Sequence, residues 1–327
     1  MPLVLDPPKN AAGQALPVGP LSSTKKRRAT GDQVFHGLVA GSAGTIPLIA
    51  VAMLALLGVA SMECFRTQGL AFFLKQDWDP VHGSYGMLAF AYGTLASSLI
   101  ALLIAGPVGV GIALAITEFT HPKVRELAAW LVETLSAIPS VIFGLWGMFV
   151  LAPLMRSHIE PLLTRIPGPF FREAGTGLSL LSAGLVVSIM ILPTVMAVCR
   201  EVFNAIPVSM RESAMALGST RWESVRLAVL APSMPGIIGA LILAMGRALG
   251  ETMAVTMVIG NRAEISSNLL APSDSLASAI ANQFTEATTS GHLSALAALG
   301  FVLFLITMIL NMAAQGLVWL VKRRVGA

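Results

Sequence analysis

The chain has 327 residues, of which 55% are hydrophobic and 12% are charged, against roughly 25% charged residues in a soluble domain. With a mean hydropathy of +0.77, this composition excludes a soluble globular domain and predicts a polytopic membrane protein. The net charge of +4 does not indicate nucleic-acid binding, because membrane topology accounts for the excess, and two cysteines imply no disulfide framework.

The first 35 residues differ in composition from the rest of the chain. They are rich in Pro, Gly, Lys and Arg and contain too little apolar surface to fold alone. We therefore predict a disordered cytoplasmic tail over residues 1–35. Its basic run, Lys-Lys-Arg-Arg at 25–28, is interpreted as a cytoplasmic anchor for the helix that follows.

Six apolar stretches of about 20 residues or more follow the tail, the length that a helix needs to cross a bilayer. They lie at about 38–61, 88–117, 127–155, 178–199, 236–260 and 293–320. The pattern predicts an all-α membrane protein with six transmembrane helices.

The distribution of Lys and Arg predicts the orientation of these spans. If the N-terminus lies inside, most of the 21 Lys and Arg residues fall in cytoplasmic segments, as the positive-inside rule requires. Both termini are then cytoplasmic. The chain divides into a first helix with its outer loop (36–87), a core of five helices (88–320) with a cytoplasmic loop at 200–235, and a short tail (321–327).

Three consecutive spans contain a proline each: Pro107, Pro139 and Pro193. Proline inside a helix removes a hydrogen bond and kinks the helix. Kinked helices that line a cavity open to alternate sides are one interpretation. The other is ordinary helix packing, since membrane helices tolerate Pro and Gly.

The cytoplasmic loop at 200–235 carries helix signals. Ser209 precedes Glu212 by three residues and Thr220 precedes Glu223 by three, which is the spacing of a capping box. Gly218 lies between them, where a C-cap glycine is expected. We predict a short helix over 209–217, a glycine turn and a second helix. So short a helix is marginal alone and needs a partner surface.

The stretch 246-GRALGETMAV-255 places Arg247 and Glu251 inside the fifth apolar run. A charge at the bilayer centre costs roughly 2.5–3.5 kcal/mol on insertion scales, so a polar path for a charged solute is the default hypothesis. Residues at i and i+4 share one helix face. We expect Arg247 to pair with Glu251 at rest and to be shared with an anion during passage; a permanent structural ion pair is the alternative.

The cytoplasmic loop resembles the EAA loop of ABC importer permeases. Glu212, Ser213, Ala214 and Gly218 match the family pattern in position, with Ser in the second place. The pattern departs later, where Pro232 falls one residue late. In that family the short helix docks in a groove of the ATPase subunit. The resemblance implies that the residues coupled to the ATPase are Ser209, Arg211, Glu212, Ser213, Ala214, Leu217 and Gly218.

Further segments resemble the permeases of high-affinity phosphate importers of the PstC type. These are 136-SAIPSVIFGLWG-147, 192-LPTVMAVCREVFNAIP-207 and, most specifically, 246-GRALGETMAVTMVIGN-261. The resemblance covers roughly residues 70–320. It implies a type I ABC importer permease fold in the bacterial inner membrane and a phosphate path along Arg247 and Glu251. Arginine suits a tetrahedral oxyanion because its planar fork donates to two oxygens at once.

The resemblance also implies the partners: a homologous PstA-type permease, two PstB-type ATPase subunits, a PstS-type phosphate-binding protein and membrane lipid, without nucleic acid. The chain has no Gly-x-x-x-x-Gly-Lys-Ser/Thr run. We therefore expect no cofactor and no enzymatic activity in this chain, with ATP bound by the partner ATPase. The alternatives are a permease for sulfate or molybdate, a gradient-driven transporter or channel, and a purely structural membrane subunit.

Overall fold

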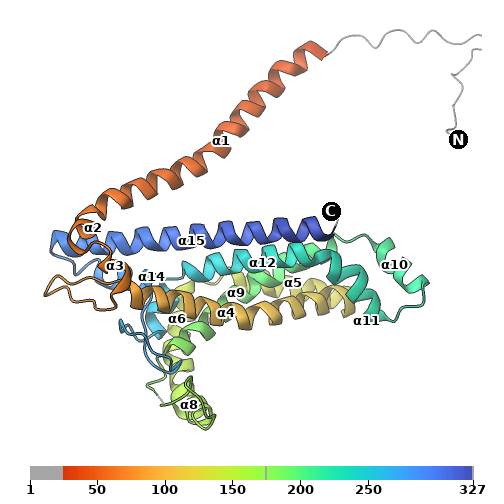
Figure 1. Ribbon diagram of the computed structural model, residues 1–327. Helices are drawn as coiled ribbons and strands as arrows, with labels where there is room; N and C mark the ends of the chain where they lie inside the picture. Colours follow the sequence, from red (N-terminus) through yellow and green to blue (C-terminus); the bar gives the residue numbers. More distant parts are fainter. Residues whose placement is uncertain (1–24, 174, 326–327) are drawn as a thin grey trace, which may run out of the picture. The chain divides into compact units, whose positions relative to one another are not determined.

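A computed structural model describes residues 25–173 and 175–325 of the chain. The chain divides into two compact units, residues 1–55 and 56–327. The described part of the first unit is helical and belongs to α1 (Lys25–Ala60). The predicted disordered tail is therefore wrong for residues 25–35, and its residues 1–24 lie outside the described ranges. The second unit contains the other helices and carries the candidate sites (Figure 1).

Six helical segments are long and apolar enough to cross a membrane. Together with the absence of β-sheet from the described ranges, they confirm the predicted all-α class and the number of spans. The segments are Gln33–Ala60, Leu88–Phe119, Ser140–Leu163, Leu180–Asn204, Arg221–Leu249 and Ser290–Trp319.

The second unit is built from fourteen further α-helices joined by short loops or π-helical turns. The α-helices are α2 (Met62–Gln68), α3 (Ala71–Leu74), α4 (Leu88–Leu114), α5 (Pro122–Ser136), α6 (Ser140–Trp146), α7 (Ala152–Leu154), α8 (Glu160–Leu163), α9 (Leu180–Asn204), α10 (Val208–Ala216), α11 (Arg221–Ser224), α12 (Ala231–Leu249), α13 (Met253–Val258), α14 (Leu276–Gln283) and α15 (Ser290–Val325). The π-helical turns are η1 (Ala115–Phe119), η2 (Gly147–Leu151), η3 (Met155–Ile159) and η4 (Val225–Leu230). Helices α10 and α11 lie at one end of this unit, and α2, α3 and α14 lie at the other (Figure 1).

The third span differs from the predicted 127–155. Pro139 has extended backbone (φ −57°, ψ 138°) and directly precedes α6, because a proline cannot continue the preceding helix. Helix α5 is therefore a separate element, and the span begins at Ser140. The hydropathy window joined two helices that the proline separates.

The fifth span also differs from the predicted 236–260. Helices α11 and α12 join through η4 into one segment from Arg221 to Leu249. The second helix of the predicted loop is thus the start of the span itself. The helix stops at Leu249, and the apolar run continues as the short α13. A hydropathy window misplaces both the start and the end of this span. Its first residues are polar although they are helical, and the apolar run continues after the helix has ended.

The main core lies where α4 and α12 pack against α9. Small residues allow this close approach: an added Cβ at Gly184 of α9 would lie 2.5 Å from Ile100 of α4, and one at Gly109 of α4 would lie 2.8 Å from Val195 of α9. Close backbone approach at small residues is typical of membrane helix pairs. Helix α9 is consequently the most buried of the six spans.

A second core lies at the end of the unit that carries α2, α3 and α14. Phe72 and Phe90 are fully buried there, together with residues of the first part of α15. Trp78 packs edge-on against Phe90 and donates its indole N–H to Gln283 Oε1 at 2.7 Å. Residues 56–87 thus pack on the same compact unit as the remaining spans.

Candidate translocation and coupling sites

Arg247 lies in the last turn of α12, and its side chain is exposed. Its Nη1 donates a hydrogen bond to Thr194 Oγ1 of α9 at 3.1 Å. Thr194 is roughly 21 Å along the helix from Leu180 and roughly 15 Å from Asn204, at 1.5 Å per residue. Arg247 therefore lies near the middle depth of α9, although its own helix ends there.

Glu251 lies beyond the end of α12, where the backbone leaves the helix at Gly250 (φ −88°, ψ 0°). Its Oε1 accepts a hydrogen bond from the backbone N–H of Ala254 at 3.2 Å, in the first turn of α13. Among the described residues no ion pair joins Arg247 to Glu251. The predicted pairing is wrong, because i and i+4 share a face only where the helix is continuous.

The break between α12 and α13 explains how each charge is stabilised. Arg247 lies at the C-terminal, negative end of the α12 dipole, and Glu251 lies at the N-terminal, positive end of α13. The Thr252 hydroxyl donates to the carbonyl of Gly250 at 3.2 Å, which satisfies a backbone group that the helix end leaves open. Discontinuous membrane helices of this kind form ion and substrate sites in transporters.

A groove with about 400 Å³ of accessible space opens beside Arg247. It lies between α9, α12 and α15, and its polar lining comes from Thr194, Arg247, Thr307 and Asn311. Gly246 also lines it, and an added Cβ there would lie 3.7 Å from Asn311 Oδ1. Hydroxyl, amide and guanidinium donors therefore converge at mid-span on one face of the unit.

The three prolines have different surroundings. Pro107 and Pro193 lie inside the helices α4 and α9, and neither proline ends its helix; neighbouring helices stabilise such prolines in membranes. The predicted kinks at these two positions stay a prediction. Pro139 lies at the junction of α5 and α6. Pro107 lines an apolar groove together with Gly106 and Gly111.

Helix α10 (Val208–Ala216) corresponds to the predicted short helix at 209–217, and Leu217 is its C-cap. The predicted capping box of Ser209 and Glu212 is wrong, because the helix starts one residue earlier, with Pro207 at the N-cap and no side-chain cap. Ser209, Glu212 and Ser213 are exposed. Gly218 follows in the left-handed region (φ +87°), as expected for a C-cap glycine.

The second predicted capping box is present. Thr220 is the N-cap of α11, its Oγ1 accepts from the Glu223 backbone N–H, and Glu223 Oε2 accepts from the Thr220 backbone N–H at 2.8 Å. This reciprocal pair fixes the start of the fifth span. Leu217 and Trp222, on either side of the turn, are 90% and 56% exposed.

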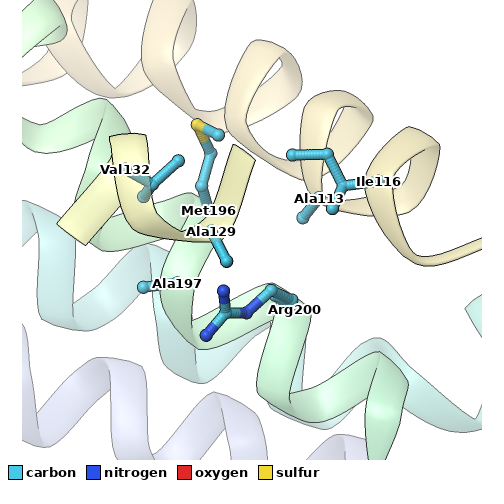
Figure 2. Close-up of a pocket in the computed structure, with 7 residues that line it drawn as sticks. All are labelled: Ala113, Ile116, Ala129, Val132, Met196, Ala197 and Arg200. Carbon is cyan, nitrogen blue, oxygen red and sulfur yellow. The ribbon is translucent and has the colours of Figure 1, made fainter. Parts of the chain in front are cut away.

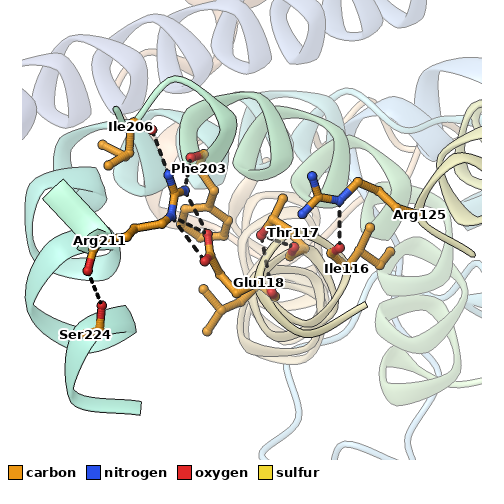
Figure 3. A network of polar contacts seen from close by, with 10 residues as sticks. Ile116, Thr117, Glu118, Arg125, Phe203, Ile206, Arg211 and Ser224 are labelled. Atoms are coloured by element: carbon orange, nitrogen blue, oxygen red, sulfur yellow. Dashed lines mark hydrogen bonds and ion pairs between the residues drawn. The ribbon is translucent and has the colours of Figure 1, made fainter. Parts of the chain in front are cut away.

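Arg211 does not face outward with the rest of α10. Its Nη2 lies 2.8 Å from Glu118 Oε1, its Nε lies 3.2 Å from both carboxylate oxygens, and its remaining donors reach the carbonyls of Phe203 and Ile206 (Figure 3). The side chains of Arg211 and Glu118 are 19% and 10% exposed. The sequence analysis assigned Arg211 to coupling with the ATPase and did not identify Glu118 as its partner. A carboxylate at the end of an apolar span was the one feature of the sequence that could have indicated Glu118.

A small apolar pocket lies between α4, α5 and α9, with Arg200 beside it (Figure 2). Its free space is about that of one water molecule, so it cannot hold a solute anion. Arg200 pairs with the exposed Glu201 at 3.2 Å. The groove beside Arg247 is therefore the better candidate for a translocation site.

Comparison with known proteins agrees with this architecture. The sequence model of the family described as "Binding-protein-dependent transport system inner membrane component" matches residues 105–327. The chain is 39% identical to the phosphate transport system permease protein PstC of Mesorhizobium japonicum, covering 97% of this chain and 100% of that protein. It is 42% identical to PstC of Pasteurella multocida, covering 85% and 89%.

Two solved transporters share the fold. An inward-facing structure of the MetNI methionine ABC transporter matches with a TM-score of 0.55 and 17% identity over 72% of this chain and 95% of that one. A bacterial alginate ABC transporter matches with a TM-score of 0.52 and 17% identity over 91% and 97%. The chain therefore belongs to the PstC family of phosphate transport system permeases, which are multi-pass inner-membrane components of ABC importers.

Proposed function

We propose that this chain forms half of the transmembrane path of an ATP-driven importer of inorganic phosphate. The observation that carries the proposal is the exposed guanidinium of Arg247 in a groove at mid-span that polar and apolar side chains line together. Its one hydrogen bond among the described residues goes to a neutral hydroxyl, that of Thr194, so no carboxylate neutralises it there. The PstC relatives are phosphate permeases by name.

The chemistry of the groove suits a tetrahedral oxyanion. The guanidinium fork donates two parallel hydrogen bonds to an anion and stays charged at every physiological pH. The hydroxyl of Thr194 and the amide of Asn311 add neutral donors without adding charge, whereas the Thr307 hydroxyl donates to the carbonyl of Leu303 at 2.7 Å. A single cation among neutral donors attracts an anion and still allows its release.

In this proposal α10 is the coupling helix. Its outer face presents apolar side chains, with Val208, Met210 and Met215 each more than 40% exposed; a face of this kind fits a groove on a partner. We propose that the partner is one of two PstB-type ATPase subunits, which bind the ATP, and that the α10 end of the unit is cytoplasmic. The chain itself is a non-catalytic permease subunit.

A PstA-type permease would complete the path beside the Arg247 groove, and a PstS-type binding protein would deliver phosphate at the opposite end. Closure of the ATPase pair would move α10 and open the groove outward. When the ATPase pair opens again, the groove would open to the cytoplasm. This is alternating access around a site near mid-membrane.

The test is ATP-dependent phosphate uptake by the complete complex in proteoliposomes. Arg247→Lys keeps the charge and removes the fork, and Arg247→Ala removes both; the loss of charge-assisted hydrogen bonds predicts uptake about 10- to 100-fold lower for Arg247→Ala, with Arg247→Lys intermediate. The control is Arg262→Gln, since Arg262 is an exposed loop residue paired with Glu264 at 2.8 Å.

Two results would refute the proposal. One is wild-type uptake in assembled Arg247→Ala complexes, which would make this arginine structural. The other is competition by sulfate or molybdate that matches competition by unlabelled phosphate, which would make the complex an importer of another oxyanion. Transport by this chain without its ATPase would remove the ABC mechanism altogether.

A further inference from the structure

Helix α10 is attached to the membrane part of the unit by very few side chains. None of its nine residues is buried. Only Arg211 and Ala214 are even partly covered, and the others are exposed. Nine residues are too few for a stable helix in water, and apolar burial contributes little here. The polar contacts of Arg211 therefore provide most of the attachment of α10 to the rest of the unit.

Arg211 first ties α10 to the end of α9. Its Nη1 donates to the carbonyl of Ile206 at 2.8 Å, and its Nη2 donates to the carbonyl of Phe203 at 2.9 Å. Both carbonyls lie at the C-terminal end of α9, where backbone acceptors are left open and the helix dipole is negative. A guanidinium is well suited to this position because it donates in several directions at once.

Arg211 also ties α10 to the end of the second span. Glu118 lies in η1, the π-helical turn that continues α4, and accepts from Nε and Nη2 of Arg211. With 19% and 10% of the side chains exposed, solvent screens this pair much less than a surface pair. The two residues are 93 positions apart in sequence, so the contact is a true tertiary link.

The surrounding backbone strengthens the same junction. The Ser224 hydroxyl of α11 donates to the carbonyl of Arg211 at 3.3 Å, which links α10 to the start of the fifth span. Arg125 of α5 donates from Nε to the carbonyl of Ile116 in η1 at 3.1 Å. Figure 3 shows both contacts flanking the Arg211–Glu118 pair. The guanidinium therefore joins the ends of the second and fourth spans, while the fifth span and α5 attach beside it through backbone carbonyls.

We propose that the Arg211–Glu118 pair is the clamp that transmits motion of α10 to the second and fourth spans together; the proposal rests on the coupling role of α10 proposed above. Arg211 is a positioning residue, and it contacts neither the ATPase nor phosphate. Through α9 the motion reaches Thr194, which holds Arg247. Through α4 it reaches the groove at Pro107. Chain connectivity alone would move only α9 and the fifth span.

The first test measures coupling in the complete proteoliposome complex. Glu118→Gln keeps the shape of the side chain and removes its charge, and Arg211→Lys keeps a charge but cannot hold both carbonyls and the carboxylate. We expect uptake per ATP hydrolysed to fall about 10-fold in Glu118→Gln and less in Arg211→Lys, with normal assembly. The control, Glu201→Gln, removes a pair with Arg200 in which the glutamate side chain is 69% exposed, and it should stay within about 2-fold of wild type.

The second test measures whether the clamped elements move as one body. Spin labels at Phe119→Cys and Ala216→Cys, both exposed sites, report the distance between η1 and α10 in a background where Cys64 and Cys199 are alanine. We expect the same narrow distribution in the nucleotide-free and the ATP–vanadate-trapped complex. Adding Glu118→Gln should broaden it and make it depend on nucleotide.

Two outcomes would overturn the clamp. One is a 119–216 distance that changes between the two states in the protein with Glu118 intact. The other is wild-type uptake per ATP in Glu118→Gln. A wrong proposed function would give a different result, because the wild-type complex would then show no ATP-dependent phosphate uptake.

Discussion

Asp274 predicts a dependence of stability on pH that can be worked out from the structure. This carboxylate is 3% exposed and lies just before α14, in the loop that follows α13. Its Oδ1 accepts from the backbone N–H of Ser275 at 2.8 Å. Burial raises its pKa from the ordinary 3.8 to about 6, although hydrogen bonds from Ser278 and Ser275 oppose the shift.

The raised pKa means that the folded protein holds the proton more tightly than the unfolded chain does. The stability that the neutral form contributes is fully present below pH 3.8 and is lost as the pH rises through about 6. A shift of roughly 2 units corresponds to about 3 kcal/mol of unfolding free energy. Asp274→Asn keeps the Oδ1 acceptor and removes the titration, so the variant should lose none of this stability over the same range.

The assay is thermal unfolding of the detergent-solubilised complex from pH 4.5 to pH 7.5. We expect the wild-type midpoint to fall relative to that of Asp274→Asn, by several degrees, most of it between pH 5 and pH 7. Asp79→Asn is the control: its carboxylate is 44% exposed and a hydrogen bond with His82 lowers its pKa, so the wild-type decline should remain. Parallel pH curves for wild type and Asp274→Asn would refute the reasoning.

Further substitutions test the local geometry. Gly93→Ala should destabilise the unit strongly, because the new Cβ would lie 1.9 Å from the carbonyl oxygen of Asp274, whereas Gly111→Ala meets open space and should be neutral in the same thermal assay. Gly218→Ala forces an L-residue to φ +87° and should cost about 1 kcal/mol, seen as faster proteolysis of the loop at 200–235. Thr220→Ala removes the N-cap of α11 and should lower the local stability of that helix by about 1 kcal/mol, which the same proteolysis assay would detect.

The features that the sequence predicted well are those set by short-range patterns. Hydropathy found all six spans, since length and composition alone decide whether a helix can cross a bilayer. The Thr220–Glu223 box and the left-handed Gly218 are also present, because both depend on residues three or four apart. The matching box at Ser209 failed because α10 begins at Val208 with Pro207 as its N-cap, so Ser209 lies inside the first turn.

The features that the sequence missed depend on contacts between distant segments. Nothing local marks Glu118 as the partner of Arg211, because the contact exists only when the ends of α4 and α9 lie side by side (Figure 3). Span limits failed for a related reason. A hydropathy window cannot separate α5 from α6 at Pro139, nor extend the fifth span back to Arg221, since helices end where caps and prolines end them.

The break after Leu249 changes what Arg247 can do. Had the helix continued, Glu251 would have shared its face and could have neutralised it. Instead the backbone leaves the helix at Gly250, and Glu251 accepts from the backbone N–H of Ala254 in α13. The partner of Arg247 within the described ranges is the neutral hydroxyl of Thr194. A charge at this depth is costly unless helix ends, polar side chains or water in the groove stabilise it. Because that stabilisation comes without a carboxylate partner among the described residues, the proposed path leaves the guanidinium available to an anion that enters the groove.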